Sequence, residues 1–82
     1  MELRHLRTFR AVAETGSFTL AGRRVNLSQA AVSLHIKTLE EELGTKLFAR
    51  VRKRATLTPA GRALLRHAQA ILNACDVARA EI

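Results

Sequence analysis

Four cationic side chains stand within five residues near the middle of the chain, between two short apolar runs. The apolar runs predict a two-stranded hairpin between Thr45 and Thr58, with its tip at Val51 to Arg54. Side chains at a hairpin tip are exposed, so cations there suit the minor groove or the flanking phosphates of a nucleic acid. A solvated charge run is the alternative interpretation. The four cations are Arg50, Arg52, Lys53 and Arg54.

A second set of candidate residues lies upstream, at the start of a predicted helix. Ser28 is the predicted N-cap, and the helix runs to Leu43 and ends at Gly44. At about 100° per residue, one arc of this helix carries no acidic residue in its first turns. Amide and hydroxyl groups on such an arc can bond base edges in a major groove, and small apolar groups can meet a thymine methyl. The alternative interpretation is that these are only the exposed residues of an ordinary amphipathic helix. The set comprises Ser28, Gln29, Ala30, Ser33, Leu34 and Lys37.

Two further helices must position these groups. A first helix opens the chain and ends at Gly16, and Ser17 caps a shorter second helix. Asn26 tolerates the left-handed conformation of a tight connection, and Leu27 anchors that connection in the core. Gly22, inside the second helix, costs about 1 kcal/mol of helix stability or permits close packing. The residues expected to face the core are Phe18, Leu20, Ala21 and Val25 of the second helix and Val32, Ile36, Leu39 and Leu43 of the third.

A long last helix begins with Thr58 as N-cap and Pro59 in its first turn, and runs to the end of the chain. Its apolar residues recur at alternating three- and four-residue spacing. The helix extends on the order of 30 Å, which is too long to pack wholly on so small a domain, so its stripe is expected to continue onto a second copy. The expected dimer residues are Leu64, Ala68, Ile71, Cys75 and Ala78.

Together these elements predict a mainly α fold. It is a winged helix-turn-helix, with three helices plus a short two-stranded wing, followed by a long C-terminal linker helix. Residues 1–58 form the expected DNA-binding domain, and residues 59–82 form the linker and dimerisation helix.

The 82 residues carry a formal net charge of +7, which favours a polyanionic partner, either nucleic acid or an anionic membrane. A membrane role fits poorly because the last helix has no aromatic anchors. RNA recognition also fits poorly, because all three Phe occupy predicted core positions. The chain has no signal peptide pattern and no apolar run long enough to span a bilayer, so a cytoplasmic location is expected.

The residue pattern does not favour an enzyme, a metal site or a cofactor site. His5, His35 and His67 are far apart in the sequence and lack metal-ligand spacing with carboxylates. No Gly-rich phosphate loop and no strand-turn-helix nucleophile setting is present. The single cysteine, Cys75, excludes an internal disulfide framework and is expected to act as a small hydrophobic residue.

The order of these motifs resembles the N-terminal domain of bacterial LysR-type transcription regulators over essentially the whole chain. The matching stretches are Leu3–Phe9, Ala13–Phe18, Leu27–Ser33, Ile36–Gly44, Leu47–Arg50 and Leu57–Gly61. The resemblance implies a homodimer that forms when the linker helices of two copies pair antiparallel. It also implies that the winged helix-turn-helix domains of this dimer bind a partly palindromic site in double-stranded DNA. It also implies base contacts from Gln29, Ala30, Ser33 and Leu34, and minor-groove contact near Lys53. Family members carry a further C-terminal domain that binds a small-molecule effector; this chain ends with the linker helix, so we expect an excised domain.

Three positions depart from the usual family pattern. Ala30 stands where proline is common, Leu34 stands where arginine is common, and the wing lacks its customary glycine. The loss of an arginine removes a guanine or phosphate contact, so the family's usual base preference is not expected to hold here.

Two other classes of function remain open at this point. A protein-interaction or dimerisation module would use the long helix, with the basic charge only solubilising the chain. A non-specific nucleic-acid binder would use the basic charge alone. The basic wing argues against the first, and the groove-compatible face of the third helix argues against the second.

Overall fold

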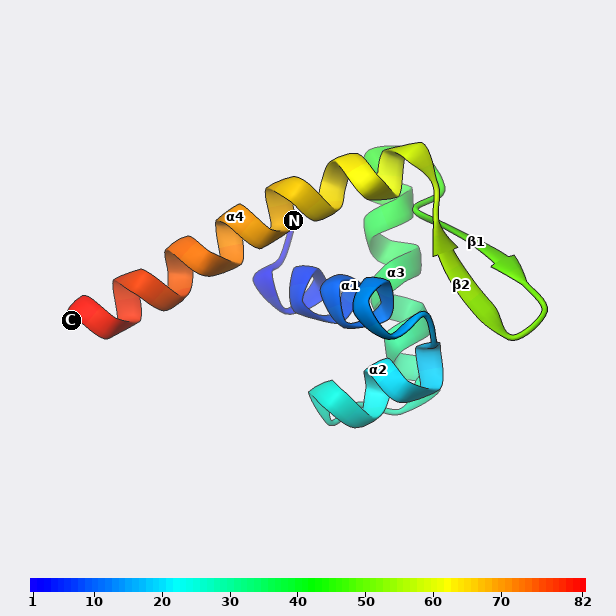
Figure 1. Cartoon of the computed structure of the whole chain (residues 1–82), viewed down its shortest axis with the longest axis horizontal. Coiled ribbons are helices and arrows are strands. Elements are labelled where there is room, and N and C mark those ends of the chain that lie inside the picture. Colours follow the sequence, from blue (N-terminus) through cyan, green and yellow to red (C-terminus); the bar gives the residue numbers. More distant parts are fainter.

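The computed structural model describes all residues, 1–82, and contains four helices and one antiparallel hairpin (Figure 1). The predicted winged helix-turn-helix with a long last helix is confirmed. The elements are α1 (Leu3–Thr15), α2 (Phe18–Val25), α3 (Gln29–Leu43), β1 (Phe48–Val51), β2 (Arg54–Leu57) and α4 (Pro59–Glu81).

The helix ends follow the predicted caps. Gly16, Asn26 and Gly44 take left-handed backbone conformations at the ends of α1, α2 and α3. At the helix starts, a hydroxyl oxygen accepts a hydrogen bond from a backbone N–H three residues later. These pairs are Ser17 with Leu20 at 3.1 Å, Ser28 with Ala31 at 3.1 Å, and Thr58 with Gly61 at 3.0 Å.

Helix α1 lies at the centre of the domain, and α2, α3 and α4 all pack against it. The three phenylalanine rings meet in the core: Phe48 lies 5.3 Å from Phe9 and 6.1 Å from Phe18 between ring centres. Their burial confirms the predicted core positions and leaves no exposed aromatic ring for base stacking.

Two predicted core residues are exposed instead. Leu20 is 47% exposed because it lies two residues after buried Phe18, which places it about 200° around the helix, on the outer side. Leu43 is 42% exposed because it occupies the last turn of α3, where neighbouring elements no longer cover the core side.

Close packing explains the glycine inside α2. A Cβ atom on Gly22 would lie 2.5 Å from the carbonyl oxygen of Leu27, because the chain folds back tightly after Asn26. The carbonyl oxygen of Gly22 in turn accepts a hydrogen bond from the Leu27 N–H at 2.8 Å. Of the two roles expected for Gly22, close packing is therefore the one that the structure shows.

The wing closes through a two-residue turn, since Val51 pairs with Arg54 across the hairpin. Arg52 has φ +60°, while Lys53 is not among the residues with positive φ, which is the pattern of a type II′ turn. Glycine normally fills the first position of such a turn, so arginine there is strained. Strand β2 is tied to the end of α1 by a hydrogen bond of 2.9 Å from the Ala55 N–H to the Gly16 carbonyl oxygen.

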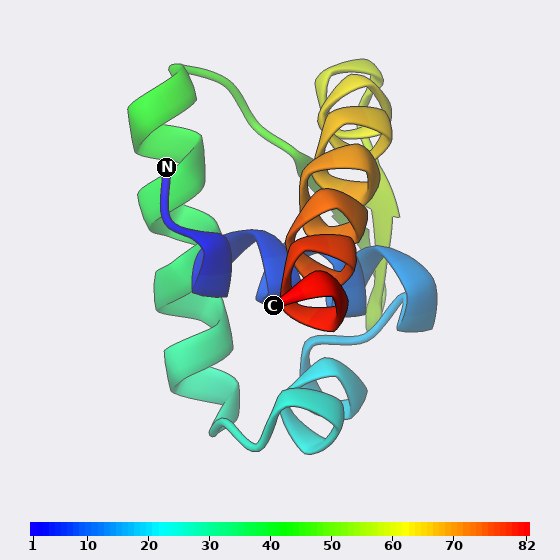
Figure 2. The same cartoon turned by 90° about the vertical axis from the view of Figure 1, so that its left-hand side faces the viewer.

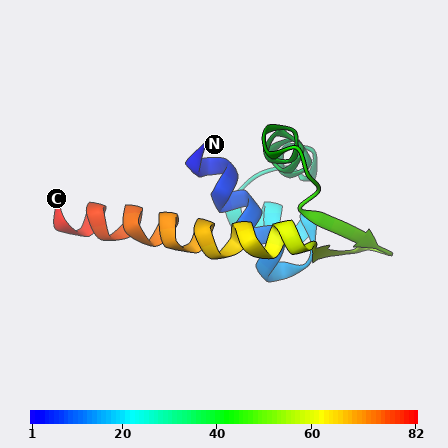
Figure 3. The ribbon, with the colours of Figure 1, turned by 90° about the horizontal axis from the view of Figure 1, so that it is seen from above.

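Helix α4 divides into a packed half and a projecting half. Leu64, Ala68 and Leu72 are buried against the core. Beyond Leu72 the helix runs past the rest of the domain, as Figure 3 shows from above. None of the helices is sufficiently long and apolar to cross a membrane.

Candidate nucleic-acid interface

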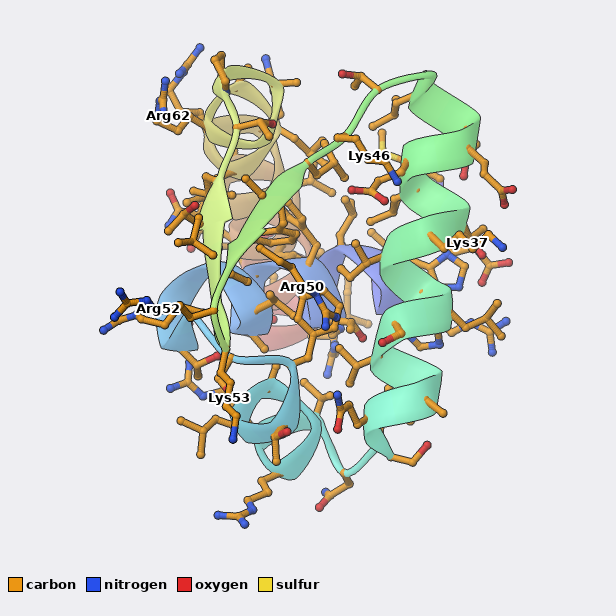
Figure 4. All side chains as sticks on the ribbon, turned by 90° about the vertical axis from the view of Figure 1, so that its right-hand side faces the viewer. Lys37, Lys46, Arg50, Arg52, Lys53 and Arg62 are labelled. Carbon is orange, nitrogen blue, oxygen red and sulfur yellow. The ribbon has the colours of Figure 1, made fainter.

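Helix α3 and the wing stand side by side and border a common face of the molecule (Figure 4). Two grooves open on this face, and Phe18 and Arg50 line both. The first lies between the start of α3 and the wing and includes Thr19, Gln29 and Lys53. The second lies between α3 and β1 and includes Ser33 and Lys37. We call this face the front face.

The residues of the predicted arc of α3 lie on the front face or next to it, and most of them are exposed to solvent. Ser28, Gln29, Ala30 and Lys37 are exposed, and Ser33 is half-buried. Leu34 is 62% exposed, so its side chain is accessible to a partner on this arc. The Gln29 side-chain oxygen accepts a hydrogen bond from the Thr19 hydroxyl at 3.4 Å. This contact places α2 beside the candidate base-reading residues, and sequence reasoning had not singled out Thr19.

The four wing cations are exposed and have no acidic partner. The chain contains four ion pairs, and none of them involves the wing or Lys37. Glu40, Glu41 and Glu42 lie near the end of α3, away from its N-terminus. The positive end of the α3 dipole therefore adds to the field of the wing instead of being offset by nearby carboxylates.

Arg50 lies within β1, where it pairs with Ala55, and not in the turn at the tip of the wing. Its guanidinium carbon is 3.8 Å from the centre of the Phe18 ring, in cation–π geometry. In Figure 4 its side chain points into the space between β1 and α3. Arg52 and Lys53 form the tip instead. The four predicted cations therefore occupy three environments: two lie in the turn, Arg54 pairs with Val51, and Arg50 stacks on Phe18 next to α3. The sequence did not predict that Phe18 would hold the Arg50 side chain.

The five predicted dimer residues occupy two different environments. Ala68 is fully buried and Leu64 is 8% exposed, both in the core of this chain. They cannot also face a second copy, because α1 and its neighbours already cover them. Ile71 and Cys75 are half-buried, and Ala78 is exposed on the projecting half of α4.

The histidines form a packed contact between α1 and α3. The rings of His5 and His35 lie 4.5 Å apart, and His35 Nδ1 is 2.9 Å from the Thr8 hydroxyl. Burial, together with the positive charges of His5 and Arg4, lowers the pKa of His35. No three His, Cys, Asp or Glu side chains come together as metal ligands would.

Known proteins match this chain in both sequence and fold. An uncharacterized HTH-type transcriptional regulator of Azotobacter vinelandii is 49% identical over 79 residues, covering 96% of this chain and 55% of the relative. The HTH-type regulator YwqM of Bacillus subtilis is 44% identical over 79 residues, covering 96% of this chain and 27% of the relative. The chain therefore spans about half the length of the first relative and about a quarter of the second.

Two solved structures with bound DNA share the fold. The BenM DNA-binding domain in complex with catB site 1 DNA matches with a TM-score of 0.94 and 40% identity, covering 99% of this chain and 90% of that one. The CbnR DNA-binding domain in complex with DNA matches with a TM-score of 0.87 and 38% identity, covering 99% and 98%. Residues 3–62 match the family described as bacterial regulatory helix-turn-helix protein, lysR family. This chain belongs to the lysR family of bacterial regulatory helix-turn-helix proteins.

Proposed function

We propose that this domain binds double-stranded DNA sequence-specifically, as the DNA-reading part of a dimeric transcription regulator in the bacterial cytoplasm. The observation that carries the proposal is the front face, where unpaired wing cations stand next to the open arc of α3. In this arrangement α3 enters the major groove and the wing contacts the minor groove or the flanking phosphates. The two similar domains solved with bound DNA support this assignment.

The side chains on α3 suit direct reading of bases. Gln29 can bond the edge of an adenine through two hydrogen bonds, and Ser33 can donate or accept one. Ala30 and Leu34 offer apolar contact to thymine methyl groups. Because Leu34 stands where the family resemblance leads us to expect an arginine, we propose a site richer in A·T pairs at this position than an arginine would select.

The deciding experiment is selection of bound sequences from a random duplex pool, followed by affinity measurements on the enriched site at several salt concentrations. Enrichment of a partly palindromic site would establish specific, two-fold recognition and supply the operator. Binding without enrichment would show that the domain contacts only the DNA backbone, without sequence preference, and would contradict the proposal.

Replacing Gln29 with alanine is expected to weaken binding to the selected site by about 1–3 kcal/mol, because one bidentate base contact is lost. Binding to unrelated DNA should change little. The matched control is Gln69→Ala, which removes an exposed glutamine of α4 remote from the front face. An equal loss on the selected and unrelated sequences would show that Gln29 does not read a base.

We also propose that α4 pairs with the same helix of a second copy, through Cys75 and Ala78 of the projecting half and through Ile71, which lies just before it at the edge of the core. These residues continue the stripe whose first part, Leu64 and Ala68, packs on the core of this chain. On this interpretation, one face of α4 packs on the core of its own domain near the start of the helix and on the partner helix near its end.

Introducing a charge by Ala78→Glu is expected to leave the chain monomeric at concentrations where the unmodified chain dimerises. The reason is that an unpaired carboxylate at the interface would cost several kcal/mol. The matched control is Ala80→Glu, which places the same charge about 200° further around the helix. Sedimentation equilibrium distinguishes the two, and a dimeric Ala78→Glu variant would exclude this pairing face.

A further inference from the structure

A second concave surface lies on the side of the molecule opposite the front face. It consists of two adjoining hollows of about 520 and 200 Å³ between α1, the end of α2 and α3. Both hollows include Arg7, Arg24 and Val25, so they form one continuous trough, which we call the rear groove. Figure 2 shows the ribbons of α1, α2 and α3 from the side opposite to the view of Figure 4.

The rim of the rear groove is cationic, with Arg4, Arg7, Arg10 and Arg24 around it. Arg7 and Arg10 have no carboxylate partner. Arg4 pairs with Glu2 at 3.0 Å and Arg24 pairs with Glu14 at 2.7 Å, but all four of these side chains are largely exposed. Exposed pairs of this kind contribute little, so an incoming carboxylate can replace Glu2 or Glu14 at small cost.

The floor of the rear groove is apolar. Val25 and Leu27 lie there, half-buried, and pack against the core. From Arg4 to Arg10 the trough follows α1 for about 9 Å, at 1.5 Å per helical residue. A trough of about 9 Å accommodates roughly three residues of an extended peptide, and its apolar floor can accept a side chain between the charges.

The orientation of α3 keeps the rear groove clear of the front face. His35 lines the groove, and it lies about 200° around α3 from Ser33 on the front face. The lowered pKa of His35 leaves its imidazole neutral near pH 7, so the positive charge of the groove belongs to the arginines. DNA seated on α3 and the wing would leave these arginines exposed.

We infer that the rear groove is a docking surface for an acidic peptide segment of another protein, with carboxylates on the arginine rim and an apolar side chain on Val25 and Leu27. The inference rests on the proposed function only for the statement that DNA occupies the opposite face. A DNA-bound domain could thereby hold a second protein next to its site.

The test uses a fluorescein-labelled synthetic peptide of eight residues in which aspartate and glutamate alternate with leucine. Fluorescence anisotropy measures its binding to the 82-residue chain without DNA, so the result does not depend on DNA recognition. We expect Arg7→Ser to weaken binding roughly tenfold, as loss of a charge-assisted contact does. Arg52→Ser removes the same charge from the front face and should change the affinity less than twofold. Replacing the leucines of the peptide with serine should also weaken binding, since the floor would lose its contact.

Three results would overturn the inference. Equal losses for Arg7→Ser and Arg52→Ser would indicate general attraction to a basic protein. If the selected DNA duplex displaces the peptide, the peptide binds to the front face and not to the rear groove. Binding by the Ala78→Glu monomer alone would show that a second copy covers the groove. Circular dichroism of Arg7→Ser verifies that the variant folds.

Discussion

Replacing Gly61 with alanine is expected to destabilise the domain by about 1–3 kcal/mol, the usual cost of inserting an atom into a closely packed site. The added Cβ would collide with the carbonyl oxygen of Leu47 and press on the Leu57 side chain. The Leu47 oxygen cannot withdraw easily, because it accepts a hydrogen bond from the Thr58 N–H at 3.0 Å. A loss in this range lowers the melting temperature of a domain of this size by roughly 4–24 °C. Thermal unfolding followed by circular dichroism measures it.

The control for this prediction is Gly44→Ala. No atom lies within 4 Å of a Cβ at Gly44, so only its positive φ of +68° opposes the substitution. A smaller loss, of about 1 kcal/mol, is expected from that backbone strain alone. Alanine normally stabilises a helix relative to glycine by about 1 kcal/mol, so a Gly61→Ala variant more stable than the parent would mean that α4 does not approach Leu47 as closely as described.

Removing both tip charges of the wing, by Arg52→Gly and Lys53→Ser together, is expected to reduce the salt dependence of DNA binding. Each phosphate contact contributes about 0.9 to the slope of log K against log salt concentration, so two contacts contribute about 1.8. Near 0.1 M salt this corresponds to an affinity loss between roughly tenfold and a hundredfold. Glycine at position 52 suits the positive φ, so the hairpin should keep its shape.

A matched double variant, Arg66→Ser with Arg79→Ser, removes two exposed charges from α4. This variant has the same net charge as the wing variant. Its slope of log K against log salt concentration should stay close to that of the unmodified chain. Similar slopes for the two variants would show that the wing tip makes no phosphate contact and that the net charge alone accounts for binding.

The parts of the fold that the sequence predicted correctly depend on local interactions. Ser17, Ser28 and Thr58 cap helices through bonds to residues three positions away, and Gly16 and Gly44 end helices through their own backbone conformation. Such signals need no knowledge of distant contacts. The wing was predicted from the two short apolar runs on either side of the basic stretch, even though its turn lacks glycine.

The parts that could not be predicted depend on contacts distant in sequence. Arg50 stacks on Phe18, which lies 32 positions earlier, and no spacing rule connects the two. Leu64 and Ala68 share a helix face with Ile71 and Ala78, so periodicity alone could not separate the part that covers the core from the part that projects. Leu43 has the correct periodicity for the core but lies where α3 extends past its neighbours.

The unbroken course of α4 has a mechanical consequence. No glycine or proline follows Gly61, so the helix has no built-in hinge between the wing and its last residues. Its packed half is clamped by Leu64, Ala68 and Leu72, and its projecting half forms a stiff lever arm of roughly 13 Å at 1.5 Å per residue. A torque applied at the far end of that arm is therefore transmitted to α1 and the base of the wing as a rigid rotation, and is not absorbed by bending on the way.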